Sequence, residues 1–100
     1  MKFLFNLQTQ TLKISHQDHS LILDENHQFR TLGGIGFALD YPELPRKPKR
    51  WIIFKVYSQK IKVIYKTTTL DGSLVYYNKT TPYPTSKVVE VRFSEQDRLC

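Results

Sequence analysis

The fold is decided by residues 51–77, WIIFKVYSQKIKVIYKTTTLDGSLVYY. Residues 51–57 form an apolar run broken by one lysine, and over 61–66 Ile61, Val63 and Tyr65 alternate with Lys62, Ile64 and Lys66. Alternation with a period of two is typical of a half-buried strand, because successive side chains of a strand point to opposite faces. Asp71-Gly72 is a strong hairpin signal, so we expect 74–77 to pair back on 61–66. The stretch therefore predicts three consecutive antiparallel strands.

Strand-like segments cover most of the remaining chain. They are residues 3–7, 12–14, 20–24, 29–40 and 88–93. No window carries apolar residues at the spacing of a helix. The 100 residues are 40% apolar and 24% charged, which is typical of one globular domain with a single core. We predict an all-β domain over 1–94, a small antiparallel sandwich or partly open barrel of about seven strands, and a polar C-terminal tail over 95–100.

Other features of the sequence limit its class. Cys100 is the only cysteine, so a disulfide framework is excluded. The first apolar patch ends at Asn6, well short of the apolar core of a signal peptide. No 18-residue stretch lacks charge, so no membrane-spanning helix is expected. We predict a cytoplasmic protein, or a nuclear one if the source is eukaryotic or viral.

Positive charge is concentrated in one part of the chain. The net charge is +6, yet residues 1–43 are net negative, and residues 44–70 carry eight basic residues and no acidic one. Such an asymmetry indicates an anionic partner, which is nucleic acid, an acidic protein or an acidic membrane surface. The oligomeric state is left open.

The basic stretch combines a loop with a strand. Prolines at every third position between 42 and 48 exclude a helix and predict an extended loop that displays its basic side chains. Side chains of like parity share a face, so the lysines of 60–66 are expected on one face of their strand. Cations beside aromatic rings are what single-stranded nucleic-acid binders use. The predicted binding residues are Arg46, Lys47, Lys49, Arg50, Trp51, Lys60, Lys62 and Lys66.

The aromatic residues of this region are expected to divide between two faces. Tyr65 alternates with the lysines and is predicted to enter the core, whereas Tyr76 and Tyr77 point oppositely, so one of them joins the lysine face. The alternative is that all of the aromatics are core and that the lysines protect a sheet edge from pairing.

No catalytic or metal site is predicted. His16, Asp18, His19 and His27 have the spacing of no closed zinc site, and Cys100 has no surroundings that would activate its thiol. The glycines of 33–36 predict a bulge or tight bend rather than a phosphate loop, because no helix follows them. We expect no cofactor and no enzymatic activity.

One segment has a family resemblance. Residues 21–40, which include Gly33-Gly34-Ile35-Gly36-Phe37-Ala38-Leu39, resemble the N-terminal segment of GHMP-type small-molecule kinases, in the beta-ribofuranosylaminobenzene 5'-phosphate synthase branch. In that family a short strand, a turn and a GGIG-x-A-L strand follow one another. The family's phosphate loop, roughly Pro-x-x-x-Gly-Leu-Gly-Ser-Ser, is absent from this sequence. The resemblance implies a fragment or relic without the nucleotide site, and no functional residue is carried over from it.

Three functions follow from these observations. The favoured one is a non-catalytic basic module that contacts nucleic acid through the loop and strand of 46–66. The alternative is a structural or protein-interaction subunit that docks an acidic partner through the same face. The third is the relic of a GHMP-type enzyme.

Overall fold

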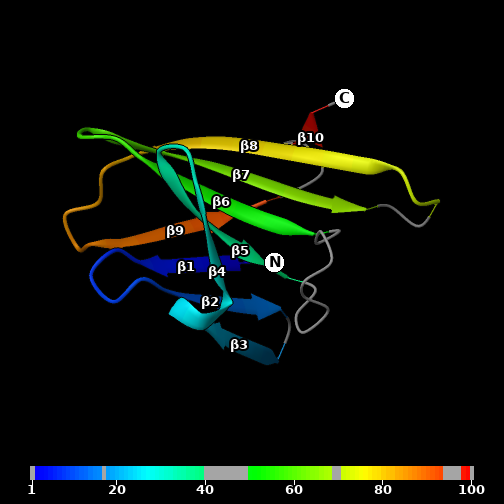
Figure 1. Cartoon of the computed structure of the whole chain (residues 1–100), viewed down its shortest axis with the longest axis horizontal. Coiled ribbons are helices and arrows are strands. Elements are labelled where there is room, and N and C mark those ends of the chain that lie inside the picture. Colours follow the sequence, from blue (N-terminus) through cyan, green and yellow to red (C-terminus); the bar gives the residue numbers. More distant parts are fainter. Residues whose placement is uncertain (1, 17, 40–49, 69–70, 94–97, 100) are drawn as a thin grey trace.

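Two antiparallel sheets make up the computed structural model, which describes residues 2–16, 18–39, 50–68, 71–93 and 98–99. One sheet has four strands in the order β3-β2-β1-β9, and the other has six in the order β10-β8-β7-β6-β5-β4 (Figure 1). The four-stranded sheet contains β1 (Lys2–Asn6), β2 (Thr11–His16), β3 (His19–Leu23) and β9 (Val88–Arg92). The six-stranded sheet contains β4 (Gln28–Thr31), β5 (Gly34–Ala38), β6 (Trp51–Val56), β7 (Lys60–Thr68), β8 (Leu74–Pro82) and β10 (Arg98–Leu99).

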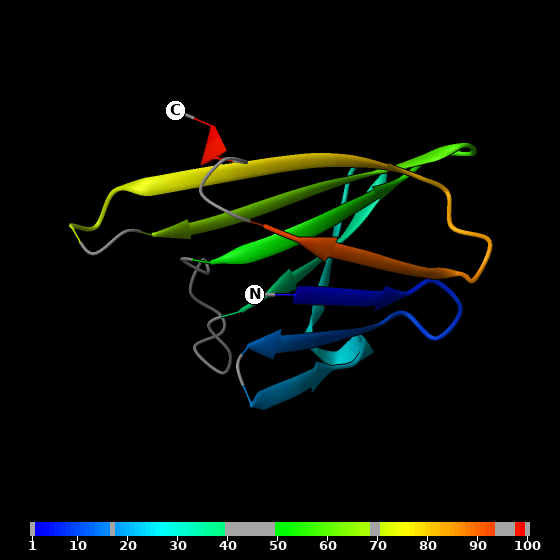
Figure 2. The same ribbon diagram turned by 180° about the vertical axis from the view of Figure 1, so that it is seen from behind.

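The chain passes between the two sheets through short connections. The single-turn 3-10 helix η1 (Glu25–His27) leads from β3 to β4, and residues 83–87 lead back from β8 to β9. Figure 2 shows the two sheets from behind, with β10 and β8 at the top of the molecule and β3 at the bottom. The predicted all-β antiparallel sandwich is confirmed, and the sheets do not close into a barrel.

The described residues form ten strands, more than the predicted seven, partly because 29–40 is a hairpin rather than one strand. Thr31 pairs with Gly34 at the end of the β4–β5 ladder, and the chain turns through Leu32 and Gly33. Gly33 has a φ of 77°, which a residue without Cβ adopts at little cost. Gly33 thus lies in a tight bend, which is one of the two alternatives that the sequence left open.

The core lies between the sheets and is filled by the inward side chains of both. The ring of Phe5 in β1 stacks on that of Phe54 in β6, with centroids 4.4 Å apart. The ring of Phe3 lies 5.2 Å from that of Tyr65. Residues packed in this core are Phe3, Phe5, Leu12, Leu23, Ile35, Phe37, Ile52, Phe54, Ile61, Val63, Tyr65, Val89 and Val91. The outward faces of both sheets carry polar, charged and some apolar side chains, and the candidate site lies on one of these faces.

The C-terminal segment also contributes to a sheet. Within 95–100, predicted as a polar tail, Arg98 and Leu99 form β10 and pair with Tyr77 and Tyr76 of β8. The part of the chain that the structure describes has no helix with the length and apolar character that a membrane crossing requires.

Candidate nucleic-acid interface

The candidate interface is the outer face of the six-stranded sheet, and the register of β6, β7 and β8 determines its composition. Ile52 and Phe54 point into the core, so Trp51, Ile53 and Lys55 point outward from β6. The β6–β7 register sets Lys55 directly opposite Lys62. The outer face is therefore crossed by rows of neighbouring side chains, one from each strand.

The first row carries a cluster of lysines. Lys55 and Lys62 are half-buried neighbours, and Lys60 is exposed on the same face of β7; we call these three residues the lysine patch. The Nζ of Lys60 lies 5.6 Å from the centroid of the Tyr57 ring. Neither of the ion pairs among the described residues includes a member of this patch. Its three charges therefore reinforce one another.

Lys55 is a member of the patch that is not among the predicted binding residues. In the sequence it interrupts the apolar run of 51–57. The available signal was the short connection between β6 and β7, Tyr57 to Gln59, which fixes residue 55 opposite residue 62 once the two strands form a hairpin. Parity then places Lys55 on the same face as Lys62.

Lys66 lies on the predicted face of β7, but it is not an exposed cation. Trp51, Lys66 and Tyr76 are consecutive partners in the register of β6, β7 and β8; we call them the aromatic row. The Nζ of Lys66 lies 3.5 Å from the Trp51 ring centroid and 6.0 Å from that of Tyr76. Only 5% of Lys66 is exposed. The expectation that this lysine displays its charge to a ligand is corrected, because the two rings cover it.

The expected division of the tyrosines is confirmed. Tyr65 is buried and stacks on Tyr77, with ring centroids 5.6 Å apart, so both belong to the core side of the sheet. Tyr76 points the other way and is 41% exposed beside Lys66. One tyrosine of the pair 76–77 therefore joins the lysine face.

The surface between the two rows is apolar and closely packed. Ile53 and Ile64 are half-buried neighbours on β6 and β7. Next to them the ring of Phe29 lies over Gly36, so close that a Cβ on Gly36 would come within 2.4 Å of the Phe29 Cζ atom. The outer face thus has an apolar middle, with the lysine patch on one side and the aromatic row on the other.

Of the basic residues predicted in the loop, only Arg50 belongs to the described part of the structure. Arg46, Lys47 and Lys49 lie outside the described residues. Arg50 is half-buried, and its carbonyl oxygen accepts a hydrogen bond of 2.9 Å from the N–H of Leu39. This bond ties the end of β5 to the residue before β6, beside the aromatic row.

The histidine-containing turns hold no metal-binding group among the described residues. His27 Nδ1 lies 2.8 Å from Asp24 Oδ1, and the Asn26 N–H donates a 3.0 Å hydrogen bond to the same oxygen. That backbone hydrogen bond, and then the contact with His27, lower the pKa of Asp24 below its usual value of 3.8. The arrangement caps η1, which is a structural role.

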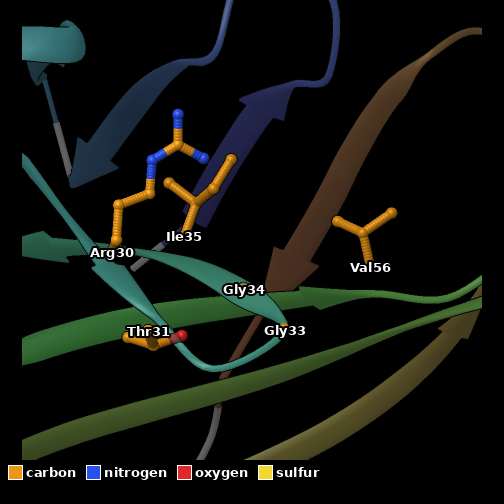
Figure 3. Close-up of a pocket in the computed structure, with 6 residues that line it drawn as sticks. All are labelled: Arg30, Thr31, Gly33, Gly34, Ile35 and Val56. Atoms are coloured by element: carbon orange, nitrogen blue, oxygen red, sulfur yellow. The ribbon is translucent and has the colours of Figure 1, made fainter.

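An open pocket of about 340 Å³ lies at the β4–β5 turn, on the other side of the sheet from the lysine patch. In Figure 3, Arg30, Ile35 and Val56 project to one side of the strands, with Gly33 of the turn and Gly34 at the start of β5 beside them. The buried hydroxyl of Thr31 has no hydrogen-bond partner among the described residues. Arg30 supplies the pocket with a single charged group, which is too little to define a ligand.

The outer face of the six-stranded sheet is thus the most strongly featured surface of the described residues. It combines three lysines that have no ion-pair partner among the described residues with exposed tyrosines and an apolar middle. No family model, curated protein or solved structure matches the chain, so its function is inferred from its own residues.

Proposed function

We propose that this chain is a non-catalytic module that binds nucleic acid on the outer face of the six-stranded sheet. The observation that carries the proposal is the direct cross-strand pairing of Lys55 with Lys62, with Lys60 beside them. Like charges directly opposite each other destabilise a sheet. A bound phosphate backbone would neutralise the charges of these lysines and release counterions into solution, which favours binding.

Two exposed rings favour a single-stranded ligand. Tyr57 is 47% exposed next to Lys60, and Tyr76 is 41% exposed at the other end of the face. A base that stacks on an aromatic ring contributes about 1–3 kcal/mol, and bases are available for stacking when the strand is single. Tyrosines at both ends of a basic face suit such a ligand better than a duplex.

The test is a titration of the full chain with fluorescein-labelled oligodeoxythymidine, single-stranded or in its duplex, over a range of salt concentrations. The triple variant Lys55→Gln, Lys60→Gln, Lys62→Gln is expected to bind the single strand at least about tenfold more weakly at low salt. It is also expected to flatten the slope of log K against log salt by about 2, because each lost phosphate contact accounts for about 0.7 on single strands.

A matched control removes the same charge from the outer face of the other sheet. Lys2 and Arg92 are register partners there, and Lys13 lies two strands from Arg92 on the same face. The triple variant Lys2→Gln, Lys13→Gln, Arg92→Gln is expected to retain most of the affinity. Equal losses of affinity in the two triple variants would mean that binding depends on the net charge of the protein and not on the lysine patch. Absence of binding at low salt would contradict the proposal and favour an acidic protein as the partner.

A further inference from the structure

The open edge of β3 is the least protected strand edge of the described chain. Among the described residues, β3 is the terminal strand of the four-stranded sheet and pairs only with β2. In an antiparallel ladder alternate residues exchange both hydrogen bonds with the partner, so the intervening residues of β3 turn N–H and C=O groups to the open side. Such an edge is a template for another strand.

β3 lacks the devices that normally protect an edge. Its sequence, His19-Ser20-Leu21-Ile22-Leu23, has no proline, lysine or other formally charged residue. The opposite edge strand β9 contains Glu90 and Arg92. The edge strand β4 contains Arg30. Lysines, prolines and other charges discourage edge-to-edge pairing, and β3 alone among these three edges has none of them.

The same strand exposes two large apolar side chains. Leu21 is 56% exposed and Ile22 is 64% exposed, although Leu23 at the end of the strand is buried in the core. Leu21 and Ile22 have opposite parity, so both faces of the strand are apolar at its open edge. A strand added at this edge would cover both side chains as well as the free backbone groups.

We propose that the occupant is β3 of a second copy of this chain, paired antiparallel. A twofold axis relates the two β3 strands in such a pair, and each strand supplies hydrogen-bond partners to the open edge of the other. With the axis at Ile22, the two copies of this residue are neighbours, and Leu21 lies beside Leu23 of the other copy.

The absence of formally charged residues from β3 favours a second copy over a basic or acidic partner. Nothing along this strand would attract a charged partner, and a second copy of β3 meets it without opposing like charges. β3 is an edge of the four-stranded sheet, whereas the lysine patch lies on β6 and β7 of the other sheet. In both views β3 lies at the bottom of the molecule and β6 and β7 lie in its upper half (Figures 1 and 2). Two copies that join at β3 therefore do not bring their lysine patches together.

The experiment measures the molar mass of the full chain by sedimentation equilibrium over a wide range of protein concentration. The unaltered chain is expected to approach twice 11.8 kDa as its concentration rises. Ile22→Lys places a charge next to its own copy, and this variant is expected to remain a monomer throughout. Leu32→Lys is the matched control, because Leu32 is 97% exposed at the β4–β5 turn, and it is expected to dimerise like the unaltered chain.

Amide hydrogen exchange on the unaltered chain tests the same proposal without a variant. The β3 amides are expected to gain protection as the protein concentration rises, whereas those of the outer strands β4 and β9 are expected to stay unchanged. A monomer at every concentration, or an Ile22→Lys variant that dimerises as the unaltered chain does, would overturn self-pairing. The inference is independent of nucleic-acid binding, since Ile22→Lys leaves the lysine patch intact and is expected to bind oligodeoxythymidine.

Discussion

At the scale of single residues, the sheet face distinguishes lysines that differ little in the sequence. Lys62 and Lys66 lie four residues apart on the same face of β7. Lys62 has a lysine as its neighbour on β6, whereas Lys66 has a tryptophan. An ammonium group over an aromatic ring gains about 0.5–1 kcal/mol when exposed and about 2 kcal/mol or more when desolvated. The neighbour across the strand therefore decides whether a lysine on this face is structural or available to a ligand.

Lys66→Ala is expected to destabilise the fold by roughly 1–3 kcal/mol, because it removes the cation over Trp51 and the aliphatic stem that packs beneath it. Urea unfolding followed by the fluorescence of Trp51, the one tryptophan of the chain, measures the change. Lys13→Ala, at an exposed position, is expected to stay within about 0.5 kcal/mol of the unaltered protein. Equal stability of the two variants would mean that the aromatic row does not hold Lys66.

At the scale of elements, the alternation of apolar and polar residues predicted which positions face the core. The composition of the candidate site depends instead on the register between strands. The inward positions of β1, β6, β7 and β9 follow from period-two patterns that the sequence displays. The burial of Lys66 and the inclusion of Lys55 depend on which residues face each other across strands, and a pattern within one strand carries no such information. The split of 29–40 into β4 and β5 was missed for a related reason, since a glycine in a strand pattern fits a bulge as well as a hairpin turn.

The Asp24 side chain caps η1, and its contribution to the stability of the protein is expected to depend on pH. Its pKa in the folded protein is lowered by the Asn26 N–H and then by His27. A carboxyl group with a lowered folded pKa stabilises the protein above its unfolded pKa, and this contribution disappears as the pH falls through the folded value. Asp24→Ala is therefore expected to lower the Tm at neutral pH, and this deficit is expected to shrink as the pH falls below 3.8.

Thermal unfolding monitored by circular dichroism between neutral pH and pH 2 follows this deficit. Asp18→Ala removes another exposed carboxylate, at a position outside η1, and is expected to leave the Tm nearly unchanged across the range. A deficit for Asp24→Ala that stays constant down to the lowest pH would contradict a role for the ionised carboxylate.

At the scale of the whole molecule, one layer of aromatic and aliphatic side chains joins the two sheets. Phe5 is fully buried, stacks on Phe54 and lies 5.7 Å from Phe37, so it contacts the opposite sheet at two strands. A domain of this size has a total stability of about 5–15 kcal/mol. A single core ring that bridges the sheets therefore carries a large share of the stability of the sandwich.

Phe5→Ala is expected to cost about 3–5 kcal/mol, because it removes a buried ring and leaves a cavity between the sheets. The midpoint of urea unfolding should fall accordingly, with an unchanged slope if the unfolded state is the same. Leu74→Ala truncates a side chain that is 52% exposed and is expected to change stability by less than about 0.5 kcal/mol. A loss below 1 kcal/mol for Phe5→Ala would contradict a core shared by both sheets.

The pairing of β1 with β9 has a consequence for the order in which the chain acquires its structure. Lys2 is the register partner of Arg92, so the four-stranded sheet is completed by residues from opposite ends of the described chain. The meander β5-β6-β7-β8, in contrast, pairs only neighbours in the sequence. Closing a long loop costs more entropy than closing a hairpin and slows folding. During synthesis β6 and β7, which carry the lysine patch, are therefore able to pair before the partner of β1 has been made, and one edge of β1 stays exposed until β9 has emerged.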